Sequence, residues 1–175
     1  EERTQRAICV LAMEPGSRRA RKRVYAGSQR LWATGDDGIH WRPVSPSFDG
    51  SVISAVEIAP YDRDIVYVAT TKGGVYRSTD GGKSFEKVLY KDENTGAIQV
   101  TLDPKNPKTL YADLFAARQG PWENGHWQGA NSGLYKSTDG GSHWTHLTGG
   151  LPTPAQGLGR IGFGISLSDP HRMYA

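Results

Sequence analysis

One short motif occurs three times in this sequence and limits the chain to a repeat architecture. Its copies lie at residues 34–41, 78–85 and 137–144, and each reads Ser/Thr-x-Asp-x-Gly-x-x-Trp/Phe. Self-similar segments at a regular spacing indicate stacked supersecondary units that share a core. The motif has the chemistry of a hairpin turn, because its Asp carboxylate can accept backbone N–H groups and its glycine permits positive φ. Its aspartates are therefore expected to be structural rather than catalytic. They are Asp36, Asp80 and Asp139.

The segments before each motif repeat as well. An apolar alternating stretch comes first, then a short stretch with a tyrosine, then a shorter aromatic stretch directly before the motif. The apolar stretches lie at residues 8–13, 53–58, 98–102 and 161–167. The tyrosine stretches lie at 24–26, 66–68, 110–112 and 173–175, and the last kind at 31–32, 75–76 and 134–135. Each unit is thus predicted to have four strands, with the motif as the turn between the third and the fourth.

The length of the unit indicates a β-propeller. The anchor tyrosines Tyr25, Tyr67, Tyr111 and Tyr174 are 42, 44 and 63 positions apart. Four-stranded units of about 40–50 residues are typical of propeller blades. We therefore predict an all-β fold of antiparallel blades, about three and a half in number and incomplete as a single chain. The expected bounds are about 6–45, 51–90 and 96–148 for three blades, with a fourth starting at about 160–175.

Composition fits a soluble globular protein, and an open propeller implies self-association. Hydrophobic residues make up 37% of the 175 residues and charged residues 22%. No apolar stretch reaches the ~18 residues of a membrane span, and the first six residues lack the apolar run of a signal peptide. Open blade flanks would expose apolar side chains, so we expect an oligomer or a fragment. Cys9, alone of its kind, is expected to be a buried thiol in a core strand.

With these motifs the chain resembles the bacterial secreted Asp-box (BNR) repeat proteins, described as glycosyl-hydrolase-like or sortilin-like. The motifs, the strand at residues 66–70 and the stretch at 92–97 carry the resemblance. It implies a secreted or periplasmic protein of a bacterium. The same repeat occurs in sialidases, xyloglucan-degrading glycosidases, photosystem assembly factors and sortilin receptors, so it specifies fold better than function. It also implies that ligands bind on the loop face opposite the Asp-box turns.

The loops on that face contain the candidate site residues. Two are connections between blades, residues 43–51 with Asp49 and residues 91–97 with Asp92 and Glu93. In the third unit, 59 positions separate Asp80 from Asp139 against 44 between Asp36 and Asp80, which locates an insertion at about residues 117–131. The insertion supplies aromatic and polar candidates for a sugar platform, although packing of the tryptophans onto their own blade is the favoured interpretation. These candidates are Trp122, Trp127, His126, Arg118 and Asn124.

Two function classes remain open at this point, and a third is a further alternative. A carbohydrate or similar polar ligand could bind the loop face without catalysis, since binding needs only aromatic anchors and shape. Alternatively, a glycoside hydrolase would need two carboxylates, about 5–5.5 Å apart for retention or about 6.5–9.5 Å for inversion, in a pocket completed by oligomerisation. Asp49, Asp92, Glu93 and Glu123 are the candidate catalytic acids. A protein-binding scaffold of sortilin type, with a peptide ligand, is the further alternative.

Other chemistries find little support. The sialidase signature Phe/Tyr-Arg-Ile-Pro is absent, and its nearest match lies at residues 159–162. His143 and His146 would point to opposite faces of a strand, so no metal site is expected, and no cofactor motif is visible. The basic run at residues 18–23 lacks interleaved aromatic residues, which favours a solvated loop over a nucleic-acid contact. Neither a membrane nor a nucleic acid is an expected partner.

Overall fold

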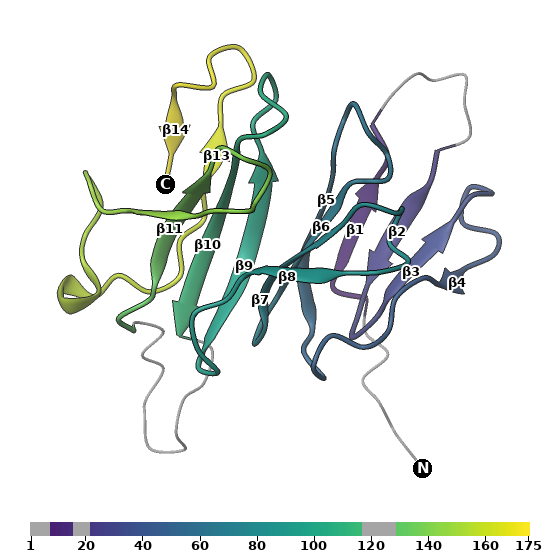
Figure 1. Ribbon diagram of the computed structural model, residues 1–175, viewed down its shortest axis with the longest axis horizontal. Coiled ribbons are helices and arrows are strands. Elements are labelled where there is room, and N and C mark those ends of the chain that lie inside the picture. Colours follow the sequence, from purple (N-terminus) through teal and green to yellow (C-terminus); the bar gives the residue numbers. More distant parts are fainter. Residues whose placement is uncertain (1–7, 16–21, 117–128) are drawn as a thin grey trace.

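The computed structural model describes residues 8–15, 22–116 and 129–175. They form three four-stranded antiparallel sheets, each built from consecutive strands (Figure 1). The first sheet comprises β1 (Val10–Met13), β2 (Val24–Gly27), β3 (Leu31–Thr34) and β4 (Arg42–Pro43). The second comprises β5 (Ile53–Ile58), β6 (Val66–Thr70), β7 (Gly74–Ser78) and β8 (Glu86–Leu89). The third comprises β9 (Thr95–Leu102), β10 (Leu110–Ala116), β11 (Gly133–Ser137) and β12 (Thr145–Leu147).

A shorter unit follows the third sheet. The 3-10 helix η1 (Pro154–Gln156) interrupts the connection, and β13 (Gly164–Ile165) then pairs with β14 (Met173–Tyr174). The prediction of all-β, four-stranded antiparallel blades in an incomplete propeller is confirmed. No described helix is both long and apolar enough to cross a membrane.

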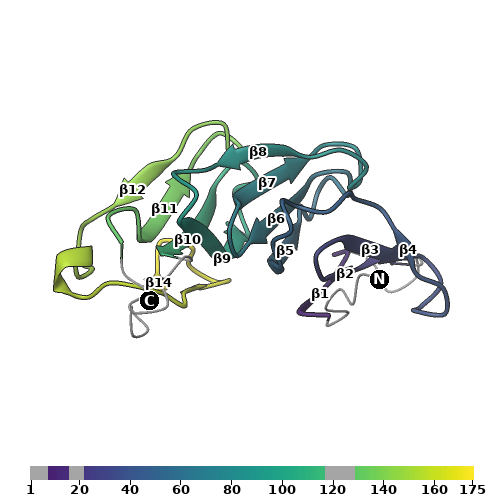
Figure 2. The same ribbon diagram turned by 90° about the horizontal axis from the view of Figure 1, so that it is seen from below.

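The sheets are arranged along an open arc. Figure 2 shows β1, β5 and β9 toward the concave side, with β4, β8 and β12 toward the convex side. The first strand of each blade thus faces a common axis, and the fourth strand forms the rim. Such a radial order buries the broad faces of the sheets against one another and leaves the loops at the two ends of the strands.

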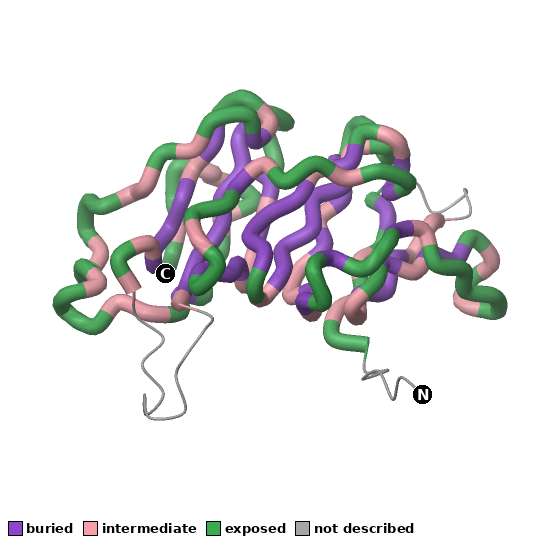
Figure 3. Tube along the Cα trace, turned by 60° about the horizontal axis from the view of Figure 1, so that its bottom comes forward, coloured by how far each residue is buried: buried purple, intermediate pink, exposed green. Residues whose placement is uncertain are grey.

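The hydrophobic core lies between sheets rather than within one sheet. One cluster joins the first and second sheets through residues such as Tyr25 and Ile53. Another joins the second and third sheets through residues such as Tyr67 and Leu110. A third cluster places Tyr111 of the third sheet against Ile161 and Phe163 of the following segment. Figure 3 shows the buried residues concentrated along the strands of the neighbouring sheets, with exposed residues in the loops. Since each cluster needs two sheets, a single blade could not bury its apolar face alone.

The aromatic residue that closes the Asp-box contributes to these cores. Phe85 packs against the cluster between the first two sheets, with its ring centroid 5.0 Å from that of Phe48. Trp144 packs in the same way against the cluster between the second and third sheets. The second and third Asp-boxes therefore anchor their blades to the preceding ones.

Among the described residues, no sheet covers the outer face of the first strand. Val10 and Ala12 pack against the cluster shared with the second sheet, while Leu11 and Met13 on the other face are 65% and 61% exposed. The expectation of a buried Cys9 is wrong: Cys9 is exposed and lies just before β1. The reason is the open flank, because the apolar pattern of this strand has no second neighbour to cover it.

Candidate functional site

The two ends of the sheets carry different kinds of connection. Because consecutive strands are antiparallel, the turns between the third and fourth strands lie at the same end as the loops between the first and second. We call this end the box face, since it carries the three Asp-box turns. The remaining loops and the connections between sheets lie at the opposite end, which we call the loop face.

On the box face, each Asp carboxylate accepts hydrogen bonds from residues of its own turn. Oδ1 of Asp80 accepts the backbone N–H groups of Lys83 and Ser84, both at 2.9 Å, and the hydroxyl of Ser78 at 2.8 Å. The Ser84 hydroxyl donates to Oδ2, and this bond is the main reason that the pKa of Asp80 is held far below its ordinary value. In the other two turns the pKa of the aspartate is lowered chiefly by the backbone N–H of a histidine. These hydrogen bonds assign the carboxylates to stabilising their turns.

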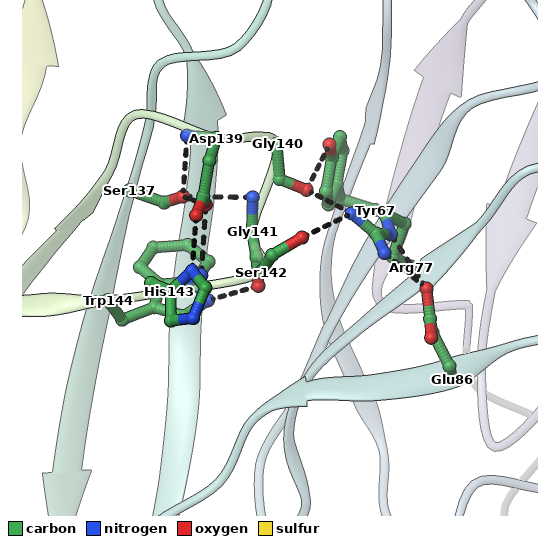
Figure 4. Close-up of polar contacts among 10 residues, drawn as sticks. All are labelled: Tyr67, Arg77, Glu86, Ser137, Asp139, Gly140, Gly141, Ser142, His143 and Trp144. Atoms are coloured by element: carbon green, nitrogen blue, oxygen red, sulfur yellow. Dashed lines mark hydrogen bonds and ion pairs between the residues drawn. The ribbon is translucent and has the colours of Figure 1, made fainter.

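The Asp-box turns also dock each blade on the previous one. Tyr25 of the first sheet donates its hydroxyl to the carbonyl of Gly81 at 3.1 Å, and Tyr67 of the second sheet donates to that of Gly140 at 2.9 Å. Figure 4 shows the second of these contacts, where Nη1 of Arg77 also donates to the Gly140 carbonyl at 2.7 Å. Both glycines have positive φ, 75° in each case, which turns their carbonyls toward the neighbouring blade.

On the loop face, Asp49 is tied to the second sheet. Its Oδ2 accepts the hydroxyl of Tyr76 at 2.6 Å and Nζ of Lys87 at 3.0 Å. These two donors, Tyr76 first, lower the pKa of Asp49. Nζ of Lys87 also lies 4.6 Å from the ring centroid of Tyr90, a side chain that is 47% exposed. Asp49 thus orients a lysine that in turn contacts an exposed aromatic ring.

Asp92 organises the next connection on the same face. Its Oδ1 accepts the backbone N–H of Asn94 at 2.8 Å and the hydroxyl of Thr95 at 2.9 Å, and its Oδ2 accepts Nδ2 of Asn131 at 2.7 Å. Although partial burial acts to raise the pKa of Asp92, these hydrogen bonds, led by that of Asn131, lower it. Glu93 beside it is exposed. Asp92 therefore joins the connection after the second sheet to the loop that precedes β11.

A stacked pair of rings lies beside Asp92, and sequence reasoning missed it. The rings of Tyr135 and His146 are 4.5 Å apart and nearly parallel, at 7°. Tyr135 donates its hydroxyl to the carbonyl of Asn131 at 3.1 Å, and Nζ of Lys91 lies 5.0 Å from the Tyr135 ring. Burial, assisted by the charge of Lys91, lowers the pKa of His146, which favours the neutral imidazole. Alignment of the repeats could have found the pair, because Tyr135 opposes His146 where Tyr76 opposes Lys87.

Asp113 is a second residue that the sequence did not single out. It lies in β10 at an irregularity of the ladder with β9, and its side chain has no exposed surface. Oδ2 accepts the N–H of Ile161 at 3.1 Å, whereas Oδ1 has no hydrogen-bond partner among the residues that the structure describes. Burial raises the pKa of Asp113 to about 7, against the opposing effects of the Ile161 N–H and the charge of Arg160. Complete burial keeps this carboxyl out of contact with a substrate in the described conformation.

The predicted catalytic acids are not brought into one pair by the described contacts. Asp49 and Asp92 have separate sets of partners, from different connections. The insertion candidates Arg118, Trp122, Glu123, Asn124, His126 and Trp127 lie outside the described residues. Over the described ranges, no group of His, Cys, Asp and Glu side chains could hold a metal ion.

Comparison with known proteins places this geometry among Asp-box propellers. The family model Sortilin-Vps10 (sortilin, neurotensin receptor 3) matches residues 29–153. A probable oligoxyloglucan-reducing end-specific xyloglucanase of Neosartorya fischeri is 30% identical over 130 residues, which are 72% of this chain and 15% of that protein.

Solved structures agree with the fold. An ancestral GH74 enzyme aligns with a TM-score of 0.76 and 20% identity, over 95% of this chain and 21% of its own. The GH74 enzyme of Niastella koreensis aligns with a TM-score of 0.61 and 21% identity, over 88% of this chain and 23% of its own. This chain thus spans less than a quarter of the length of each relative. The resemblance stated from the sequence is confirmed.

Proposed function

This chain belongs to the Sortilin-Vps10 family of propeller repeats, and on this premise we propose that its loop face binds a carbohydrate chain. The relationship to a probable xyloglucanase supports a β-linked glucan of the xyloglucan type as the ligand class. Such a ligand is found outside the cytoplasm, so the proposal includes export of the protein.

The exposed ring of Tyr90, held among ordered polar groups, carries this proposal. An aromatic face can stack on the C–H face of a sugar ring, and fixed polar groups nearby can pair with its hydroxyls. Tyr90 is oriented by Lys87, and the same connection contains Asp92, which is itself fixed by Asn131. Both anchoring carboxylates of this face, Asp49 and Asp92, have lowered pKa values and are therefore acceptors for sugar hydroxyls.

This protonation state favours binding over hydrolysis. A glycosidase needs one carboxylic acid that still carries a proton near neutral pH, in addition to a carboxylate. Asp49 and Asp92 are ionised, and Asp113, the described carboxyl with a pKa of about 7, has no exposed surface. Asp49 and Asp92 thus supply acceptors, and the buried Asp113 is not accessible as an acid.

Calorimetric titration with xyloglucan oligosaccharides tests the proposal. We expect Tyr90→Ala to weaken binding at least tenfold, about 1.4 kcal/mol. Tyr61→Ala is the matched control, because Tyr61 is similarly exposed, at 51%, in the β5–β6 loop of the box face. A wild-type chain that does not bind, or equal losses in the two variants, would contradict the proposal. Trp122→Ala extends the test to the insertion.

Hydrolysis is tested on the same oligosaccharides by following new reducing ends. Binding without turnover is expected. Turnover that is lost in Glu123→Gln or Asp92→Asn, with the fold intact by circular dichroism, would replace the binding proposal by the glycoside hydrolase alternative.

A further inference from the structure

A cleft of about 600 Å³ opens on the box face between the first and second sheets. The first sheet contributes the rim strand β4 and the residue before β2, and the second contributes its Asp-box turn and the loop before β6. Its charged lining residues are Arg23, Arg42, Lys83, Asp64 and Asp80. The cleft is thus built from two blades and lies at the opposite end of the sheets from the proposed carbohydrate site.

The junction between the second and third sheets fills the corresponding position differently. There Arg77 of β7 pairs with Glu86 of β8, with Nε at 2.8 Å from Oε1, and its Nη1 reaches the Asp-box carbonyl of Gly140 (Figure 4). Ser142 is the next Asp-box residue after the two glycines. The charges of Arg77 and Glu86 neutralise each other, so this junction holds a closed ion pair beside a neutral serine.

In the first junction all three of these positions differ. In the second sheet Arg77 of β7 is paired with Glu86 of β8. The corresponding pair in the first sheet is Ala33 of β3 with Arg42 of β4. Lys83 stands in place of Ser142 in the Asp-box turn. An ion pair and a serine are thus replaced by an alanine and two cations. The smaller side chain leaves space, and the charge reversal makes the lining basic.

The two added cations have no anionic partner of their own. Over the described residues, neither the guanidinium of Arg42 nor Nζ of Lys83 forms an ion pair or hydrogen bond, and Arg42 is exposed. Asp80 remains in the lining, but its oxygens accept bonds from its own turn. Asp64 acts on Arg23, whose pKa is raised first by its hydrogen bond to Tyr25 and further by Asp64. The positive charge of Arg42 and Lys83 is therefore available to a ligand.

We propose that this cleft is a binding site for an oxyanion, namely a sulfate or carboxylate group. The planar guanidinium of Arg42 can donate two parallel hydrogen bonds to such a group, and Lys83 adds a mobile point charge from the opposite wall. A free anion and a charged substituent of an acidic glycan share this chemistry. The site gives the protein a second ligand contact, independent of the loop face.

Titration with sodium sulfate, followed by amide NMR at constant ionic strength set with sodium chloride, tests the site. We expect saturable shifts at residues 81–83 and at Ala33, next to Arg42 across the ladder. The double variant Arg42→Gln, Lys83→Gln should weaken sulfate binding at least tenfold. The matched control Arg30→Gln, Lys72→Gln removes two exposed cations from the loop face. It should change the affinity for sulfate less than twofold. Equal losses in both double variants, or shifts that chloride reproduces, would overturn the proposal.

A second titration separates the two sources of the anion. An oligogalacturonate and a sulfated oligosaccharide are compared with a neutral cello-oligosaccharide of equal length. Binding of a charged oligosaccharide at least tenfold tighter than that of inorganic sulfate, abolished in the Arg42, Lys83 variant, identifies a glycan substituent. Equal affinities identify the free anion. Because Tyr90→Ala leaves the cleft intact, it should not affect either result, which keeps failure of this site distinct from failure of the loop-face proposal.

Discussion

The buried carboxyl of Asp113 accepts a backbone N–H with one oxygen, and its other oxygen has no hydrogen-bond partner within the described part of the chain. Burial disfavours a carboxylate in this position more than the Ile161 N–H and the charge of Arg160 favour it, so the pKa is raised. The residue lies where β10 loses register with β9 and where the chain returns at Ile161. It therefore helps to hold the segment after the third sheet, and the strength of that hold depends on its protonation.

Asp113 predicts a pH dependence of stability with a defined sign. Its pKa is about 7 when folded and near the ordinary value of 3.8 when unfolded. The folded state thus retains the proton between these values, and the stabilisation from this group, present below pH ~4, is lost as pH rises toward 7. The effect is on the order of a few kcal/mol. Urea denaturation from pH 4.5 to 8 should show a steeper fall for the wild type than for Asp113→Asn, and parallel profiles would refute this assignment.

Residue-level features of this kind could be predicted from the sequence only where they repeat. The structural aspartates could be recognised because the same turn motif occurs three times in the sequence, with Asp36, Asp80 and Asp139 at the same position. Asp113 has no counterpart, since Ala69 occupies the matching place in the second sheet. Its burial depends on how the fourth unit folds back, which no local pattern encodes. For the same reason the partners of Asp49 and Asp92 became visible only in three dimensions.

At the level of the element, the aromatic residue that closes the Asp-box makes different tertiary contacts in different blades. Trp144 packs on the core between the second and third sheets and donates Nε1–H to the Gly141 carbonyl at 2.9 Å. Trp41 makes the same local bond, to Gly38 at 3.1 Å, but no described sheet lies before its blade and Trp41 is 39% exposed. The turn is the same, and the tertiary contact is missing.

This difference predicts unequal costs for one substitution. Trp144→Ala removes a large packed side chain and should lower the free energy of unfolding by about 2–4 kcal/mol. Trp41→Ala removes the same group without the inter-sheet contact and should cost less than about 1 kcal/mol. Chemical denaturation of both variants provides the comparison. Similar losses would mean that the aromatic residue acts within its own turn and not as a link between blades.

The number and order of strands followed from the sequence because the pattern has period two and the units share one spacing. The exposure of β1 did not follow, and the wrong expectation for Cys9 shows why. Alternation identifies a strand with an apolar face, but it cannot show whether a neighbouring sheet is present to cover that face. Burial of an element is thus a property of its surroundings.

Considered as a whole molecule, the chain exposes apolar surface at both ends of the arc. Leu11 and Met13 are uncovered on β1, and Leu167 and Tyr174 are 78% and 70% exposed in the last unit. A groove of about 490 Å³ is lined by the first strands of the three sheets and by the last unit, with Leu11, Ile58 and Leu167 among its lining residues. Patches of this kind on soluble proteins are usually covered by another surface.

We therefore predict self-association through these flanks. Light scattering during size-exclusion chromatography should give a mass above the 19.1 kDa of one chain. Leu11→Ser, Met13→Ser should shift the mass toward that of one chain, because both side chains point away from the core. Ile39→Ser is the control, since Ile39 is 75% exposed in an Asp-box turn and away from the flank. A wild-type mass of 19.1 kDa would contradict the prediction.

The tyrosine-to-glycine bonds between consecutive blades, from Tyr25 to Gly81 and from Tyr67 to Gly140, have a consequence for how the molecule comes apart. Each bond couples one blade to its immediate neighbour, so cooperativity can pass only along the chain order. The free energy of the array is then a sum of blade and junction contributions, as in a one-dimensional lattice. Unfolding should begin at the first sheet or at the short last unit, and the second sheet, which has a tyrosine-to-glycine bond on each side, should exchange its amide protons last.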